Sequence, residues 1–237
     1  MKNIKILYED KDILAIDKPS GIAAHADGRS KEKTIADWIL KKYPRLKDVG
    51  EKVTFDEKEI PRPGIVHRLD KETSGVLLIM KTPSAFAYFK KQFMDRKIKK
   101  VYNAVVSGWV KNDRGVIDKP IGRSPADFRR RLAGRGARGE LKQAVTEYKV
   151  LKRLEAPAPS LDKFSYLEVR PKTGRTHQIR VHMKYLNHPV AGDALYNPKD
   201  KNWPRMMLHA KSIEFKTPSG KTAKIESPLP KEFKEFA

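Results

Sequence analysis

The sequence predicts an α+β protein that is rich in strands. Short β-prone runs recur along the 237 residues, whereas apolar residues follow helical spacing in only a few segments. A chain of this length can bury one substantial core, or two lobes that share a cleft, without disulfide staples. We therefore expect one enzyme-sized unit over residues 1–237.

The N-terminal part predicts paired strands and a bend. Residues 4–8 and 13–17 are β-prone and flank a turn-like segment, which indicates an antiparallel pair. Lys18-Pro19-Ser20-Gly21 then forces a bend. Further on, Pro61, Pro63 and Gly64 indicate a turn before the apolar run Val76–Met80, which we expect to be a buried strand.

Helical spacing is found in separate short segments. The first begins at Ile35 and ends before Pro44. The second begins at Pro83, and we expect it to bury three aromatic residues in the core, namely Phe86, Phe89 and Phe93. The third covers residues 177–186, with Asn187 suited to its end.

The remaining β-type runs lie in the second half of the chain. Residues 99–106 alternate faces, so that Tyr102 lies on a strand with Ala104 and Val106 on the same side. Further strands are expected at 144–151, 164–169, 208–215 and 222–225. Pro157–Ser160 is expected to connect two of them, and we find no internal repeat or heptad.

The charge of the chain favours a polyanionic partner. Lys and Arg number 51 against 29 Asp and Glu, a net charge of +22. Such an excess points first to nucleic acid, although it also suits a solvated surface or an anionic membrane. Two basic clusters stand out: Lys90–Lys100, and Arg123–Lys142, whose interspersed glycines predict a mobile basic loop.

Composition also limits the location and the chemistry. The strongly apolar runs are too short to span a membrane, and residues 1–8 lack the apolar core of a signal peptide. The sequence contains no Cys, which excludes disulfides, thiol nucleophiles and Cys-based zinc sites and suits a reducing cytosol. We expect a cytoplasmic protein that needs no membrane.

Two polar segments predict a catalytic site. Arg68 and Asp70 come shortly before the buried run Val76–Met80, so rigid structure should hold them on a connection. Asp70 alone could simply accept hydrogen bonds in a turn or pair with Lys71. The second segment, Thr173–His182, is dense in cationic and hydrogen-bonding side chains. Few folds need two such polar segments.

An ion pair between the two segments would explain their chemistry. A carboxylate in a partly dry site stays ionised when a guanidinium holds it, so we expect Arg180 to pair with Asp70. An ionised Asp suits nucleophilic attack or proton abstraction. Tyr102 offers a ring on which a base can stack, or it packs as an ordinary strand residue. Arg180 could instead form only surface salt bridges.

These motifs resemble those of the RluA-type pseudouridine synthases. The resemblance rests on His67-Arg68-Leu69-Asp70 with Thr73-Ser74-Gly75, on Lys100-Val101-Tyr102-Asn103-Ala104, and on Thr173–His182. Lesser matches are Lys18–Gly21, Gly192-Asp193-Ala194-Leu195-Tyr196 and Leu208-His209-Ala210. The resemblance implies a bent, mainly antiparallel mixed sheet with flanking helices and a central basic cleft.

The resemblance also implies a reaction and the residues that perform it. Specific uridines in ribosomal or transfer RNA would be isomerised to pseudouridine without a cofactor or a metal ion. Asp70 would be the catalytic carboxylate, Arg180 its partner, and Tyr102 the ring against the uracil. Arg68 would fill the gap left by the flipped nucleotide. His67, Arg175 and His177 are expected to contact the RNA.

The chain departs from the family pattern in two respects. Residues 129–138 are richer in Arg and Gly than expected. The motifs begin within the first twenty residues, so we expect no accessory RNA-binding domain before them. We therefore expect a stem-loop RNA to be chosen by the catalytic domain itself, acting as a monomer.

Two other classes of protein compete with this interpretation. An RNA chaperone would use the same charge without turnover. A metal-dependent or histidine hydrolase could be built from His177, His182 and His188, but no acidic residue lies at a ligand spacing between the first two.

Overall fold

The computed structural model describes residues 4–28, 30–55, 58–155, 162–200, 202–234 and 236. Its contacts divide the chain into two compact units. Unit 1 comprises Met1–Lys99 and Ala210–Pro228, and unit 2 comprises Lys100–His209 and Leu229–Ala237. Neither unit is therefore a single continuous stretch of chain.

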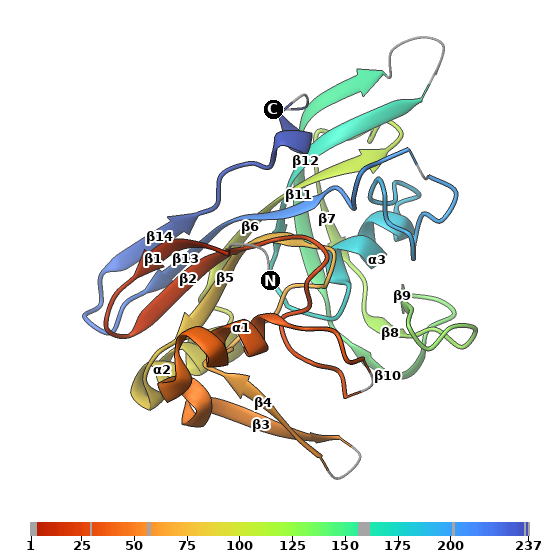
Figure 1. Cartoon of the computed structure of the whole chain (residues 1–237). Helices are drawn as coiled ribbons and strands as arrows, with labels where there is room; N and C mark the ends of the chain where they lie inside the picture. The colour runs from red at the N-terminus through yellow and green to blue at the C-terminus, as the bar shows by residue number, and fades with distance from the viewer. Residues whose placement is uncertain are drawn as a thin grey trace. The chain divides into compact units, whose positions relative to one another are not determined.

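Unit 1 is built on a mainly antiparallel sheet (Figure 1). β1 (Lys5–Glu9), β2 (Ile13–Lys18), β5 (Ser74–Met80) and β13 (Leu208–Lys216) follow one another in that order, and β14 (Thr222–Glu226) pairs with β13. The predicted pair of N-terminal strands is confirmed. Every residue of β5 is buried, which confirms the prediction for Val76–Met80.

Helices α1 (Ile35–Lys42) and α2 (Pro83–Met94) begin and end close to the predicted positions. The Thr34 hydroxyl accepts a hydrogen bond from the Asp37 amide, and the Asp37 carboxylate accepts one from the Thr34 amide, so a capping box fixes the start of α1. Phe89 is fully buried on α2, as predicted. Phe86 and Phe93 are only half-buried, because they pack at the margin of the same core.

The predicted turn is found at Pro63 and Gly64, where the Ile65 amide donates a hydrogen bond of 3.2 Å to the Arg62 carbonyl and Gly64 has φ of 64°. The sequence analysis missed the hairpin before it, because Pro61 and Pro63 also lie in β4 (Lys58–Pro63), which pairs with β3 (Gly50–Phe55). The two prolines are two residues apart, so the missing N–H groups face the same edge of the strand. The ladder can then use the residues between them. A short 3-10 helix (Pro44–Asp48) precedes this hairpin.

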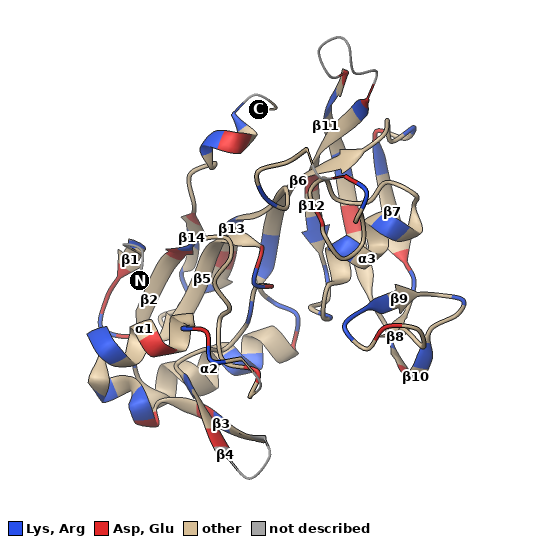
Figure 2. Ribbon diagram, turned by 45° about the vertical axis from the view of Figure 1, so that its right-hand side comes forward, with Lys and Arg blue, Asp and Glu red and all other residues tan. Residues whose placement is uncertain are grey.

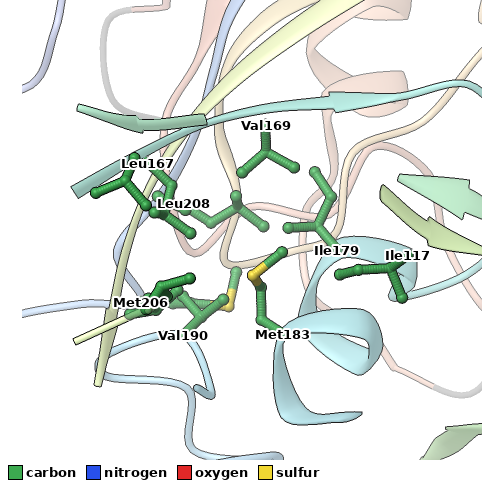
Figure 3. Close-up of a cluster of buried hydrophobic side chains, with 12 residues drawn as sticks. Ile117, Leu167, Val169, Ile179, Met183, Val190, Met206 and Leu208 are labelled. Carbon is green, nitrogen blue, oxygen red and sulfur yellow. The ribbon is translucent and has the colours of Figure 1, made fainter. Parts of the chain in front are cut away.

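Unit 2 contains an antiparallel sheet with a helix packed on it. β6 (Lys99–Ser107), β12 (Lys163–Pro171), β11 (Val145–Glu155) and β7 (Arg114–Asp118) follow in that order. Helix α3 (Gln178–Tyr185) contributes Ile179 and Met183 to the core beneath it (Figure 3). Asn187 has φ of 61°, which confirms the predicted helix end. The expected connection Pro157–Ser160 lies outside the described residues.

The basic segment of unit 2 is folded, contrary to the prediction of a mobile loop. β8 (Ile121–Arg123), β9 (Arg131–Ala133) and β10 (Arg138–Lys142) form a small sheet in the order β10-β8-β9. Gly134 and Gly136 adopt positive φ in the turn between β9 and β10, and Gly139 does so within β10. In the ribbon of Figure 2, Lys and Arg positions are coloured blue along these strands and the loops between them. The predicted α+β, mainly antiparallel fold is confirmed.

Candidate functional site

In unit 1, Asp70 lies on the connection between β4 and β5. Leu69 is buried and anchors this connection, whereas Arg68 is exposed and Asp70 half-buried. The amide of Thr73 donates a hydrogen bond of 3.1 Å to the Asp70 carbonyl, which tightens the turn that follows. Gly75 then enters β5 with φ of +112°, and a Cβ there would collide with the Ala210 backbone. Only glycine fits this position.

The bend Lys18–Gly21 holds the Asp70 connection in place. The Lys18 side chain is fully buried, and its Nζ donates hydrogen bonds to the Pro19, Ile22 and Lys71 carbonyls at 2.9, 2.7 and 3.0 Å. The Gly21 amide donates to the same Lys71 carbonyl, and the Ser20 hydroxyl donates to the Glu72 carbonyl at 2.6 Å. This motif therefore positions the two residues that follow Asp70.

His67 also has structural contacts within unit 1. Its Nε2 accepts a hydrogen bond of 2.9 Å from the Leu78 amide of β5, which requires that the ring nitrogen be unprotonated at that position. The ring stacks on Phe93 of α2 with 4.8 Å between centroids. These contacts fix the start of the Asp70 connection against a strand and a helix, and the role of His67 in binding RNA stays a prediction.

In unit 2, Tyr102 lies on β6 opposite Val169 of β12. It is half-buried and packs against the core of the unit. Lys100 lies two residues earlier, on the same side of the strand. Its Nζ donates to the Thr173 carbonyl at 3.1 Å, and burial lowers the pKa of Lys100 to about 8. Lys100 thus ties β6 to the start of the predicted motif Thr173–His182.

Arg180 forms a buried ion pair with Asp193, a residue that the sequence analysis did not assign to the site. Nε and Nη2 of Arg180 donate to the two Asp193 carboxylate oxygens at 2.7 and 2.9 Å. Arg180 is 6% exposed and Asp193 is 0% exposed. A bidentate pair with so little exposure fixes the guanidinium plane. The alternative in which Arg180 forms only surface salt bridges is wrong.

Tyr196 connects Arg180 with two other parts of unit 2. The Arg180 guanidinium lies 5.1 Å from the centre of the Tyr196 ring. The Tyr196 hydroxyl accepts a hydrogen bond of 2.8 Å from the Arg131 amide of β9 and lies 3.0 Å from Nδ1 of His177. Asp193 and Tyr196 both belong to the lesser motif Gly192–Tyr196, which was the signal available in the sequence.

The turn before α3 is fixed by buried polar contacts. Gln178 accepts hydrogen bonds from the Thr173 hydroxyl and the Arg175 amide, and donates to the Val145 carbonyl and the Thr146 hydroxyl. All four polar positions of its amide are thus used. His177, immediately before α3, adopts φ of 56°, a strained conformation for a residue other than glycine.

His182 completes this network inside unit 2. Its Nδ1 lies 2.8 Å from the Thr146 hydroxyl, and its Nε2 lies 3.0 Å from the Lys119 carbonyl, to which it donates. Burial lowers the pKa of His182 below the usual histidine value. His177 contacts Tyr196, and Nδ1 of His188 lies 2.9 Å from the Ser107 carbonyl. The three histidines of the competing hydrolase hypothesis are therefore held by separate partners.

A basic pocket of about 640 Å³ opens between the small sheet and the turn before α3. Its cationic lining residues are Arg123, Arg131, Lys142 and Arg175, with Glu140 as the acidic one. The Nε of Arg175 donates to the Gln143 carbonyl at 3.0 Å, which holds this side chain along the pocket wall. Four cations around one pocket suit a phosphate-bearing ligand.

The predicted site residues therefore fall into two groups. His67, Arg68 and Asp70 lie in unit 1, whereas Tyr102, Arg175, His177 and Arg180 lie in unit 2. The pairing of Asp70 with Arg180 stays a prediction. Among the described residues, no group of three or more His, Asp and Glu side chains is arranged to hold a metal ion. Over the same residues, no helix is long and apolar enough to cross a membrane.

Known proteins similar to this chain include curated sequences and solved structures. A relative from Aquifex aeolicus, described as an uncharacterized RNA pseudouridine synthase, is 42% identical over 86% of this chain and 60% of its own length. Ribosomal large subunit pseudouridine synthase D of Borreliella burgdorferi is 38% identical over 98% of this chain and 67% of its own length. The chain thus spans about two thirds of these relatives.

The fold comparison agrees with the sequence comparison. Human RNA pseudouridylate synthase domain containing 1 superposes with a TM-score of 0.76 at 26% identity, covering 97% of this chain and 84% of that one. The family described as RNA pseudouridylate synthase matches residues 12–185, a range that includes residues of both units. The resemblance inferred from the motifs is confirmed, and the chain belongs to the RNA pseudouridylate synthase family.

Proposed function

We propose that this chain isomerises specific uridines in structured RNA to pseudouridine, with Asp70 as the catalytic carboxylate. The observation that carries the proposal is the position of Asp70 in the family motif, on a connection fixed by Lys18, Ser20 and His67. In this reaction the glycosidic bond breaks, the uracil turns, and carbon 5 bonds to the ribose. A fixed carboxylate beside a flipped nucleotide suits that task.

Asp70 is proposed to act in its ionised form. It would attack the anomeric carbon of the ribose, or remove the proton from carbon 2 of the ribose to give a glycal. Either route requires a charged oxygen, and a guanidinium contact keeps a carboxylate charged. Arg180 has five N–H donors, and Asp193 accepts from two of them. We propose that another part of this guanidinium holds Asp70.

Tyr102 is proposed to contact the target uracil. Its ring projects from β6 on the same side as Lys100, whose contact with Thr173 links this strand to the turn before α3. A tyrosine ring offers a face for base stacking, worth about 1–3 kcal/mol per base, and a hydroxyl for proton transfer. The tyrosine would take the proton that leaves carbon 5 during isomerisation.

The cationic side chains of unit 2 are proposed to bind the phosphates of the RNA backbone. Arg123, Arg131 and Arg175 line one pocket. His177 is linked to this pocket, because its ring and the Arg131 amide both contact the Tyr196 hydroxyl. Arg68, which is exposed, would enter the stack in place of the flipped uridine. The two units would then act as one catalytic domain. The cytoplasmic location and the monomeric state stay predictions.

Large-subunit ribosomal RNA is the first substrate to test, because several relatives are named for it. Ribosomal RNA carrying tritium at carbon 5 of its uridines should release the label when the wild-type protein acts. Transfer RNA serves as the alternative substrate. Sequencing the treated RNA after chemical marking of pseudouridine would then locate the modified positions.

Asp70→Asn tests the catalytic assignment, since it removes the charge with little change of shape. We expect the rate of label release to fall by on the order of 10³-fold or more, with RNA affinity within a few-fold of wild type. Asp48→Asn, which removes an exposed carboxylate from the same unit, is the matched control. Retained activity in Asp70→Asn would exclude Asp70 from the mechanism.

The two competing classes give different results in the same experiment. An RNA chaperone would bind the RNA without releasing label from it. A hydrolase would shorten the strand, whereas isomerisation leaves both the length and the mass of the RNA unchanged. Wild-type protein that releases no label from either RNA would contradict the proposed function.

A further inference from the structure

The loop between β8 and β9 presents an aromatic side chain within a dense group of arginines. Phe128 is 73% exposed, and Arg123, Arg129, Arg130 and Arg131 lie within five residues of it in the sequence. A single exposed Phe is common on protein surfaces and means little alone. Phe128 differs from such a residue because arginines flank it closely in the sequence.

Asp127 fixes the conformation of this loop. Its carboxylate accepts hydrogen bonds from the backbone amide of Arg129 at 2.9 Å and from the Arg129 guanidinium at 3.0 and 2.8 Å. These contacts lower the pKa of Asp127 to about 2, so it stays charged at neutral pH. The Arg130 amide donates to the Asp127 carbonyl at 2.9 Å. The contacts between Asp127 and the two arginines that follow Phe128 thus fix the tip of the loop.

The two ends of the loop are fixed as well. Ser124 accepts hydrogen bonds from the Ala126 and Asp127 amides, and its own amide donates to the Arg130 carbonyl. Nη1 of Arg131 donates to the Phe128 carbonyl at 3.2 Å. A loop ordered by this many contacts keeps Phe128 exposed instead of letting it fold back onto the sheet, so the exposure is built into the structure.

The base of the loop is connected to the proposed site. Arg123 and Arg131 face each other across the β8–β9 pair, and both line the basic pocket next to Arg175. The Arg131 amide and Nδ1 of His177 contact the same Tyr196 hydroxyl. An RNA strand whose phosphates lie in the pocket would therefore reach the Phe128 loop with its neighbouring nucleotides.

We propose that Phe128 is a stacking platform for an unpaired base of the RNA, next to the nucleotides that the pocket holds. This inference rests on the proposed function for the identity of the ligand. The ring offers a flat apolar face, and the surrounding guanidinium groups neutralise the phosphates on either side of the base. Base stacking tolerates any base, so Phe128 would select unpaired structure over sequence.

The test compares two RNAs of equal length, a stem-loop with unpaired loop bases and a fully paired duplex. It is made in the Asp70→Asn background, where turnover does not change the RNA during the measurement. Phe128→Ala should weaken binding of the stem-loop by about tenfold and leave binding of the duplex unchanged. The dependence of affinity on salt should stay the same, because no charge is removed.

Three further variants separate stacking from other contacts. Phe128→Trp should keep the affinity for the stem-loop, whereas Phe128→Leu should lose most of it, because leucine is apolar but has no π face. Val116→Ala, which removes another exposed apolar side chain from unit 2, is the control and should bind as the parent does. Thermal melts of all variants should coincide, since Phe128 is exposed.

The outcomes distinguish this inference from the proposed function. If the wild type releases label from RNA but Phe128→Ala binds both RNAs as its parent does, the stacking proposal fails alone. If Phe128→Leu binds the stem-loop as tightly as the parent protein does, the contact is only apolar and the proposal is also wrong. If no label is released but Phe128→Ala selectively weakens stem-loop binding, the stacking role stands and the isomerase function fails.

Discussion

Replacing Lys18 by Met tests how strongly the bend Lys18–Gly21 stabilises the Asp70 connection. Met has nearly the length of Lys but donates no hydrogen bond, so three backbone carbonyls lose a charged donor. The Lys71 carbonyl keeps its hydrogen bond from the Gly21 amide at 2.9 Å. The cost therefore falls mainly on the carbonyls of Pro19 and Ile22.

The magnitude follows from these two groups. Leaving a buried carbonyl without its partner costs about 1–3 kcal/mol. Part of this cost is offset, because a buried methionine avoids the desolvation penalty of an ammonium group. We expect Lys18→Met to lower the free energy of unfolding by about 2–3 kcal/mol. For a chain of this size each kcal/mol lowers Tm by roughly 2–4 °C, so Tm should fall by about 5–10 °C.

Thermal unfolding followed by circular dichroism measures this change, with Lys11→Met as the control because Lys11 is exposed in the turn before β2. Label release should also be measured well below Tm. It should be reduced in Lys18→Met, since the residue after Asp70 loses an anchor. A melting temperature within about 1 °C of wild type would refute the reasoning, because a buried charged donor would then contribute nothing.

Two further predictions concern unit 2. Asp193→Asn should destabilise the protein by about 3–5 kcal/mol in urea unfolding, because the buried Arg180 guanidinium would lose the carboxylate that accepts two of its N–H groups; a loss below 1 kcal/mol would contradict this. His182 has a lowered pKa in the folded state, so the unfolded chain binds more protons below about pH 6.5 and stability should fall as the pH decreases from 7 to 5. His182→Gln should make that decline shallower, and equal slopes in both proteins would show that His182 does not contribute.

The elements that carry a clear local signal in the sequence were predictable. Val76–Met80 is an apolar run, and Thr34 with Asp37 caps a helix with regular spacing, so both were predictable from local signals. The hairpin β3–β4 was not, because Pro61 and Pro63 carry the usual signature of a turn. β9 and β10 are short and rich in Arg and Gly, and contacts such as that of the Arg131 amide with Tyr196 hold them.

The site shows the same division between local and distant information. The motif around Asp70 and the motif Thr173–His182 were recognisable by residue type alone. The partner of Arg180 within unit 2 was not, because Asp193 lies 13 residues away and the two are brought together only by folding. The role of Lys18 was also hidden, since a lysine next to a proline predicts an exposed bend and not a fully buried side chain.

The division of both units into separate segments has a consequence for the order in which the protein is made. The core of unit 1 needs Ile213, Phe215 and Ile225, which leave the ribosome more than a hundred residues after Met80. Unit 2 in turn receives Phe233 and Phe236 last. The core that packs on the apolar side chains of β5 therefore stays incomplete through most of translation. Such long-range closure slows folding and leaves early intermediates prone to aggregate.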